Sequence, residues 1–155
     1  MVGSAALASA VAVSWYSPLL SGGGYSSEAI SFALDLGFGN DGALPSFGAV
    51  QFAEHVDSSF ERGLPPQHRA ELHELLGRGR ANRAAFVRGE PGVAVCHSTP
   101  DVWHRDGAFG WGRAEPCPPP GEAVFAVGRT MYETDRIPSS WVASPSARKV
   151  SPSDH

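Results

Sequence analysis

The chain has 155 residues, a length that fits one domain, and its formal net charge is -4, with no cluster of Lys or Arg longer than residues 148–149. This charge pattern offers no surface for a polyphosphate backbone, so nucleic acid is not expected as a partner. Hydrophobic residues make up 42% and charged residues 18%, whereas 18 glycines and 13 prolines favour a loop-rich fold. No apolar stretch approaches the roughly 20 residues that a membrane-spanning helix needs, so no transmembrane segment is expected.

The first part of the chain has the pattern strand, glycine loop, helix, loop and strand. Residues 6–15 (ALASAVAVSW) are small, apolar and β-branched, which is typical of a buried parallel strand. Residues 25–36 place apolar side chains near helical spacing, and Ser26 or Ser27 is expected to cap this helix. The apolar run 47–56 then predicts a second strand.

The second part adds a helix and two more strands. Residues 65–77 begin with two prolines and place three leucines on one side, a pattern that predicts an amphipathic helix. Residues 93–97 and 123–128 are short apolar runs and predict a third and a fourth strand. Alternating strands and helices predict an α/β fold, a Rossmann-like three-layer domain with a mainly parallel sheet.

Two further segments are expected to lack regular structure. Residues 101–121 carry aromatic side chains among glycines and prolines, so we expect an irregular connection that is packed by its aromatics. Residues 143–155 are polar and have nothing to bury, so we expect a disordered tail. The predicted domain therefore spans residues 1–142.

The chain has two cysteines, Cys96 and Cys117, which are too few for a disulfide framework. Cys96 lies in an apolar run, where a buried free thiol is the ordinary expectation. With His97 and His104 the cysteines offer zinc ligands by residue type, but no CxxC or HxxxH pair supports a metal site and none is expected. Free thiols are typical of a reducing setting, so the expected location is cytoplasmic.

Three glycines, Gly22, Gly23 and Gly24, lie between the first strand and its helix. Without side chains, this loop can turn tightly and present backbone amides at a helix N-terminus, where a phosphate or a sugar hydroxyl oxygen is favoured. Ligands of open α/β sheets bind at this edge. The spacing is not GxGxxG, so the dinucleotide-binding pattern is absent, and a plain tight turn explains the glycines equally well.

Polar residues also follow the third and fourth strands. His97 ends the third strand, where it could hydrogen-bond to a sugar hydroxyl or transfer a proton, although a histidine that merely caps a strand is just as common. Arg129 and Glu133 belong to the charged segment 129–136. These charges could bind phosphate, carboxylate or sugar hydroxyls, or could pair with one another in a structural network.

Three stretches of the chain together resemble one family. They are residues 15–32 (WYSPLLSGGGYSSEAISF), 93–103 (VAVCHSTPDVW) and 117–142 (CPPPGEAVFAVGRTMYETDRIPSSWV). They resemble the N-terminal domain of retaining glycosyltransferases of the group 1, family 4 kind. The segment GRTMYETDRIPSSWV is the most specific because it is long, ungapped and unusual in composition. Residues 37–92 match the family only in their α/β pattern.

The resemblance implies a GT-B enzyme with two Rossmann-like domains. In such an enzyme the C-terminal domain holds most of the sugar nucleotide, and the N-terminal domain holds a hydroxyl-bearing acceptor. Transfer retains the anomeric configuration and needs no metal or other cofactor. By resemblance, Gly22, Gly23 and Gly24 correspond to the loop that meets the donor phosphates. His97 corresponds to a histidine near the reacting sugar, whereas Arg129 and Glu133 have a structural or acceptor-facing role.

The family pattern continues beyond residue 142 into a nucleotide-sugar domain, whereas this chain continues into the polar residues 143–155. We therefore expect an incomplete N-terminal half of a GT-B fold, which transfers a sugar only when a donor-binding domain completes it. One alternative is a non-catalytic fragment that binds a glycan or a phosphate at the glycine loop. Another is a marginal, partly folded fragment without a function.

Overall fold

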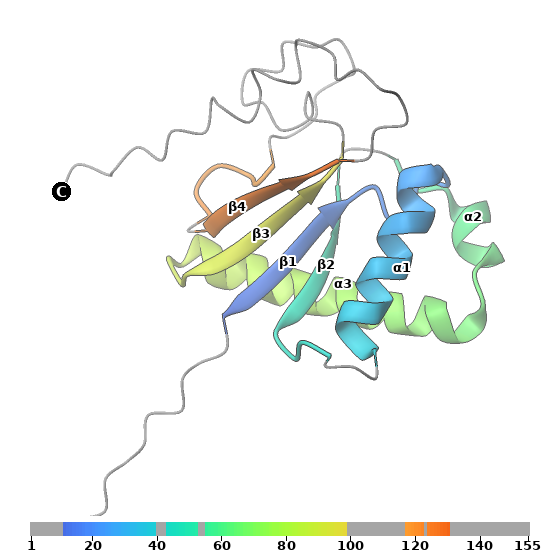
Figure 1. Cartoon of the computed structure of the whole chain (residues 1–155), viewed down its shortest axis with the longest axis horizontal. Coiled ribbons are helices and arrows are strands. Elements are labelled where there is room, and N and C mark those ends of the chain that lie inside the picture. The colour runs from blue at the N-terminus through green and yellow to red at the C-terminus, as the bar shows by residue number, and fades with distance from the viewer. Residues whose placement is uncertain (1–10, 40–42, 53–54, 99–116, 123, 131–155) are drawn as a thin grey trace, which may run out of the picture.

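The computed structural model describes residues 11–39, 43–52, 55–98, 117–122 and 124–130. The expected irregular connection, apart from its last residues, and the expected polar tail lie outside these ranges. The described residues form an α/β unit around a sheet of four parallel strands in the order β2-β1-β3-β4 (Figure 1). The strands are β1 (Ala12–Ser17), β2 (Phe47–Gln51), β3 (Gly92–His97) and β4 (Val124–Arg129). The predicted α/β class with a parallel sheet is confirmed.

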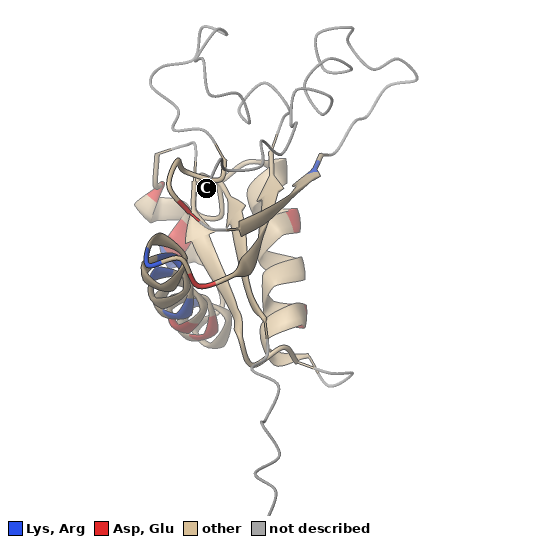
Figure 2. Ribbon diagram, turned by 90° about the vertical axis from the view of Figure 1, so that its left-hand side faces the viewer, with Lys and Arg blue, Asp and Glu red and all other residues tan. Residues whose placement is uncertain are grey.

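Three helices accompany the sheet. They are α1 (Gly24–Phe38), α2 (Ser58–Gly63) and α3 (Pro66–Val87). The helices α1 and α3 lie on opposite faces of the sheet, which gives the three layers helix, sheet and helix (Figure 2). Parallel strands are usually covered on both faces in this way, because each crossover places a helix on one face or the other.

The strand register decides which helix each side chain meets. Trp15 of β1 is aligned with Ala49 of β2, and both are buried in the core beneath α1. The next residue, Tyr16, points to the opposite face because side chains alternate along a strand. Tyr16 packs there with Val50 and Cys96 on the side of α3. The sheet therefore has two cores, and Leu72 and Leu75 of α3 belong to the one beneath α1.

The contact between α3 and β2 is made by backbone rather than by side chains. A Cβ atom added to Gly79 would lie 2.0 Å from the carbonyl oxygen of Ala49, and one added to Gly48 would lie 2.3 Å from the amide nitrogen of Gly79. Glycine permits such an approach because it has no Cβ. This contact explains why α3 continues beyond Gly77, where the predicted helix ends.

The start of α1 differs from the prediction. The N-cap is Gly23 rather than Ser26 or Ser27, so the helix begins inside the glycine loop. Ser26 lies three residues after the cap and is buried, where its hydroxyl accepts a hydrogen bond from the Gly23 amide at 3.3 Å and donates one to the Pro18 carbonyl. The serine thus fastens the loop to the end of β1.

The ends of the first two strands also differ from the prediction. β1 continues past Trp15 to Ser17, and β2 ends at Gln51. The short helix α2 is absent from the prediction, although its cap is a local signal in the sequence. The side chain of Asp57 accepts hydrogen bonds from the amides of Ser59 and Phe60, which are among the amide groups that the first turn leaves without partners.

The expectation of free thiols is wrong, because Cys96 and Cys117 form a disulfide. Both sulfur atoms are therefore unavailable as zinc ligands. The disulfide also removes the observation on which a reducing setting was expected. It connects β3 with the segment 117–122, which leads into β4. The pairing follows from the fold, which places two cysteines 21 residues apart in sequence within 5.9 Å between Cα atoms.

Candidate functional site

The parallel strands all end at one edge of the sheet (Figure 1), and the predicted site residues that the structure describes follow or end these strands. From β1 the chain passes through α1 to β2 on one side, whereas β3 lies on the other side of β1. The ends of β1 and β3 thus form a topological switch point, where open α/β sheets bind their ligands. The glycine loop follows β1, His97 ends β3 and Arg129 ends β4. Glu133 lies outside the described residues.

The three glycines of the loop have different reasons to be glycine. Gly22 has φ +82°, a left-handed conformation that favours glycine. Gly23 has φ -93°, which any residue adopts. No atom of the described residues lies within 4 Å of a Cβ added to Gly23 or Gly24. A tight turn therefore explains Gly22 alone, and no described residue fills the space in front of Gly23 and Gly24 at the N-terminus of α1.

His97 is completely buried, and both of its ring nitrogens contact polar groups. Nδ1 lies 3.2 Å from the indole nitrogen of Trp15. Nε2 lies 3.1 Å from Oε2 of Glu28 and 2.8 Å from Nη1 of Arg129. Burial lowers the pKa of His97, and the charge of Arg129 lowers it further, against the opposing effect of Glu28. The imidazole is therefore neutral at neutral pH.

Glu28 and Arg129 form an ion pair above His97. Nη2 of Arg129 donates to Oε1 of Glu28 at 2.7 Å. The side chains are 25% and 30% exposed, so this pair is the part of the cluster that solvent reaches. The hydrogen bond from Arg129 holds the pKa of the Glu28 carboxyl below its usual range. With a neutral imidazole beneath it, the cluster has no net charge.

Aromatic rings surround this polar cluster. The guanidinium carbon of Arg129 lies 4.4 Å from the ring centre of Phe32, which is stacked on Trp15. The ring of Tyr25 lies 5.5 Å from that of His97, and its hydroxyl is 3.1 Å from the hydroxyl of Thr130. Phe32 is 39% exposed, so part of this apolar side chain is left uncovered by the described residues beside the ion pair.

Sequence reasoning missed the roles of Glu28, Trp15 and Phe32. Glu28 and Phe32 lie four residues apart in α1, so they share the helix face that meets the end of β3. That spacing is visible in the sequence directly after the glycine loop. The meeting with Arg129 is not visible there, because it depends on the register that aligns Arg129 of β4 with His97 of β3.

Acidification is expected to destabilise the fold through His97. A histidine whose pKa is lowered in the folded state is protonated first in the unfolded chain, so stability falls as the pH drops below about 6.5. Glu28, whose pKa is also lowered, adds a further loss below about pH 4.5. Among the described residues, the charged and titratable groups facing His97 are Glu28, Arg129 and Tyr25.

Urea unfolding between about pH 7.5 and 5 measures this effect. We expect stability to fall across that range, because the pKa of His97 is lowered in the folded state, and His97→Gln should abolish most of the fall. An identical pH dependence in the variant would contradict the neutral state of His97.

A second polar cluster fastens the segment 117–122 on the opposite face of the sheet. Glu122 is fully buried at its side chain, and it accepts hydrogen bonds from the hydroxyl of Tyr16 and from Nε of Arg83, the latter at 2.9 Å. Burial and the neighbouring carboxylate raise the pKa of Tyr16. The phenol therefore stays protonated and acts as a structural donor.

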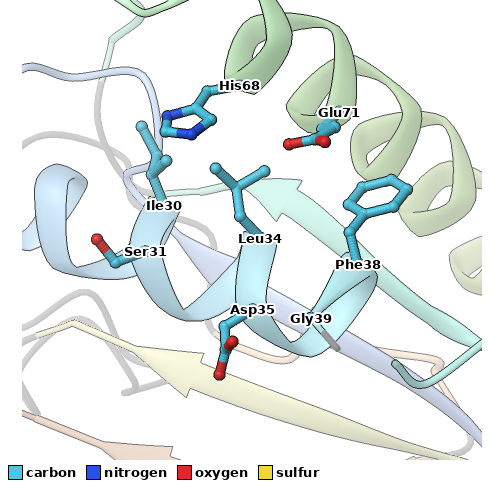
Figure 3. A pocket seen from close by; sticks show the side chains of 8 residues that line it. All are labelled: Ile30, Ser31, Leu34, Asp35, Phe38, Gly39, His68 and Glu71. Atoms are coloured by element: carbon cyan, nitrogen blue, oxygen red, sulfur yellow. The ribbon is translucent and has the colours of Figure 1, made fainter. Parts of the chain in front are cut away.

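A groove of about 400 Å³ lies between α1 and α3 (Figure 3). Its lining consists of Ile30, Ser31, Leu34, Asp35, Phe38, Gly39, His68 and Glu71. None of the predicted site residues lines this groove, which follows α1 toward its C-terminal end. The polar cluster and the groove are therefore different places on the molecule.

No family model, curated protein or solved structure matches the chain. Within the described ranges, no three His, Cys, Asp or Glu side chains are grouped so that they could hold a metal ion. The helices in those ranges are either too short or too polar to cross a membrane. The functional assignment therefore depends on the residues of the site and their geometry.

Proposed function

We propose that this chain forms the acceptor-side domain of a retaining glycosyltransferase, which transfers a sugar from a nucleotide sugar to a hydroxyl group. The observation that carries the proposal is the Glu28–Arg129–His97 cluster, which has no net charge and lies at the switch point of a parallel sheet. The resemblance of three stretches to family 4 glycosyltransferases supports it. A donor-binding domain is the partner that the reaction needs, and no metal or other cofactor has a role in it.

The chemistry of the cluster favours a neutral hydroxyl as its ligand. A hydroxyl accepts one hydrogen bond and donates another, which matches an arginine donor beside a carboxylate acceptor. A phosphate or a carboxylate would instead be repelled by Glu28 and would compete with it for Arg129. The exposed ring of Phe32 offers an apolar surface for the carbon atoms of a sugar.

The glycine loop offers a binding site for the donor phosphates. Gly23 and Gly24 begin a helix of 15 residues, whose N-terminus has a partial positive charge. The open space at these two glycines permits an approach close to the backbone. In the proposed enzyme the sugar nucleotide therefore lies between this loop and the donor-binding domain.

The burial of His97 favours a second candidate function, a glycan- or phosphate-binding protein without transferase activity. His97 touches a ligand only after Glu28 or Arg129 moves, because those two side chains cover Nε2. In this arrangement His97 orients the ion pair of Glu28 and Arg129 and is not itself an accessible base. An assay of hydrolysis and transfer with a panel of sugar nucleotides separates the two functions. Turnover by the 155-residue chain alone would contradict the need for a donor-binding domain.

The variant Arg129→Leu is expected to weaken the binding of methyl glycosides by about tenfold, because one charge-assisted hydrogen bond is lost. Isothermal titration calorimetry measures the dissociation constants. Arg80→Leu, at an exposed position of α3, is the matched control and should bind as the unsubstituted chain does. Saturable binding of the same strength in Arg129→Leu would contradict the site, provided that both variants unfold at similar temperatures.

The variant Gly23→Val is expected to weaken pyrophosphate binding by about tenfold or more, because its side chain fills the open space before the amides. Its stability should fall by no more than about 1 kcal/mol, since Gly23 has an ordinary φ and no close neighbour among the described residues. Gly63→Val, at the end of α2, is the control with similar open space. Calorimetry and thermal unfolding distinguish the outcomes. Equal pyrophosphate affinity in Gly23→Val and Gly63→Val would show that the glycine loop is a plain turn without a role in binding.

A further inference from the structure

Two hydrogen-bond donors converge on the buried imidazole of His97. The indole N–H of Trp15 faces Nδ1 at 3.2 Å, and Nη1 of Arg129 faces Nε2 at 2.8 Å. Indole and guanidinium nitrogens donate hydrogen bonds and do not accept them. A neutral imidazole has one nitrogen that accepts, because the other carries the proton. The ring therefore satisfies one of the two donors but not both.

Burial decides which donor the imidazole satisfies. Trp15 is 6% exposed and is held between Phe32 and Phe47, so its N–H has no access to water. A buried donor without an acceptor costs about 1 to 3 kcal/mol. Arg129 is partly exposed and already donates to Glu28, so it tolerates the loss of one contact.

The position of Glu28 agrees with this choice. If Nδ1 accepts from Trp15, the ring proton lies on Nε2 and points to Oε2 of Glu28 at 3.1 Å. With the proton on Nδ1 instead, the bare Nε2 would face a carboxylate oxygen and the Trp15 N–H would face another N–H. One tautomer thus gives two hydrogen bonds and the other gives one.

We infer that Trp15 is a positioning residue, which fixes His97 as the Nε2–H tautomer. In this tautomer Nη1 of Arg129 faces an N–H group that cannot accept a hydrogen bond. Nη1 is therefore ready to donate to a ligand oxygen. The ligand must bring an acceptor oxygen, which can belong to a hydroxyl, a carboxylate or a phosphate. The choice of a hydroxyl rests on the proposed function, because a hydroxyl also donates to Glu28. The tautomer itself does not rest on that function.

The expected tautomer can be read from long-range ¹H–¹⁵N correlation spectra of the labelled chain at about pH 7.5, where the imidazole is neutral. The His97 signals are assigned by their absence in His97→Gln. We expect a pyrrole-type Nε2, which carries the proton, and a pyridine-type Nδ1. A protonated Nδ1 in the unsubstituted chain would overturn the inference without any variant.

The variant Trp15→Phe removes the donor and keeps an aromatic ring. We expect His97 to lose its preference for the Nε2–H tautomer, because each tautomer then makes one hydrogen bond, to Glu28 or from Arg129. Glycoside affinity should fall by about twofold, since only about half of the molecules then keep Nη1 ready to donate. Phe47→Leu is the control, because Phe47 is buried beside Trp15, with ring centres 6.4 Å apart, whereas β1 separates its strand β2 from the strand that carries His97. This control should lower stability without moving the proton. An unchanged tautomer in a folded Trp15→Phe would overturn the role of Trp15.

Titrations with a methyl glycoside, acetate and inorganic phosphate separate this inference from the proposed function. If the glycoside perturbs the Arg129 side-chain N–H signals and acetate and phosphate do not, both the inference and the proposed function are supported. If acetate or phosphate binds there instead, the positioning role of Trp15 stands and the hydroxyl ligand is wrong. If the tautomer is as expected and none of the three probes perturbs Arg129, the inference that Nη1 donates to a ligand oxygen is wrong.

Discussion

Replacing Gly79 with alanine is expected to lower the free energy of unfolding by about 3 kcal/mol or more. The new methyl group would lie 2.0 Å from the carbonyl oxygen of Ala49, so α3 would have to move away from the sheet. Alanine otherwise stabilises a helix interior relative to glycine by about 0.5 to 1 kcal/mol. The steric effect opposes this gain and exceeds it, because the neighbouring atom is backbone and cannot rotate away.

The variant Gly77→Ala is the matched control for this prediction. Gly77 lies in the same helix, but the nearest atom to an added Cβ is Nη2 of Arg80 at 3.8 Å. We expect Gly77→Ala to raise the free energy of unfolding by about 0.5 to 1 kcal/mol. Urea denaturation of both variants gives the comparison. A Gly79→Ala chain as stable as the unsubstituted one would contradict the backbone contact between α3 and β2.

Removal of the Cys96–Cys117 disulfide is expected to cost about 3 kcal/mol, because it releases a loop with a sequence separation of 21 in the unfolded chain. The double variant Cys96→Ala with Cys117→Ala should melt at a lower temperature than the oxidised chain. A thiol reductant should lower the melting temperature of the unsubstituted chain and leave the double variant unchanged. Free thiols in the unfolded, unreduced protein would show that this disulfide does not form.

Local patterns in the sequence predict much of the fold correctly. The apolar runs after residues 92 and 123 are strands, and the leucines near residue 72 face the core, as their spacing indicates. These features depend on neighbouring residues only. Alternation of strands and helices also predicts the parallel sheet, because each pair of parallel strands needs a crossover.

Features that depend on distant contacts could not be predicted in this way. The continuation of α3 through Gly79 is stabilised by its contact with β2, and the disulfide follows from the approach of two separated segments. The partnership of Glu28 and Arg129 likewise depends on strand register. Sequence patterns identified His97 and Arg129 separately, whereas the register joins them into one cluster.

The central claim is that a neutral hydroxyl ligand binds at the ion pair above His97. The most direct measurement is a two-dimensional NMR titration of the labelled chain with a methyl glycoside. The account predicts saturable perturbations at Glu28, Phe32 and Arg129, and none along the groove beside Leu34. Perturbations centred on the groove, or none that saturate, would contradict the account.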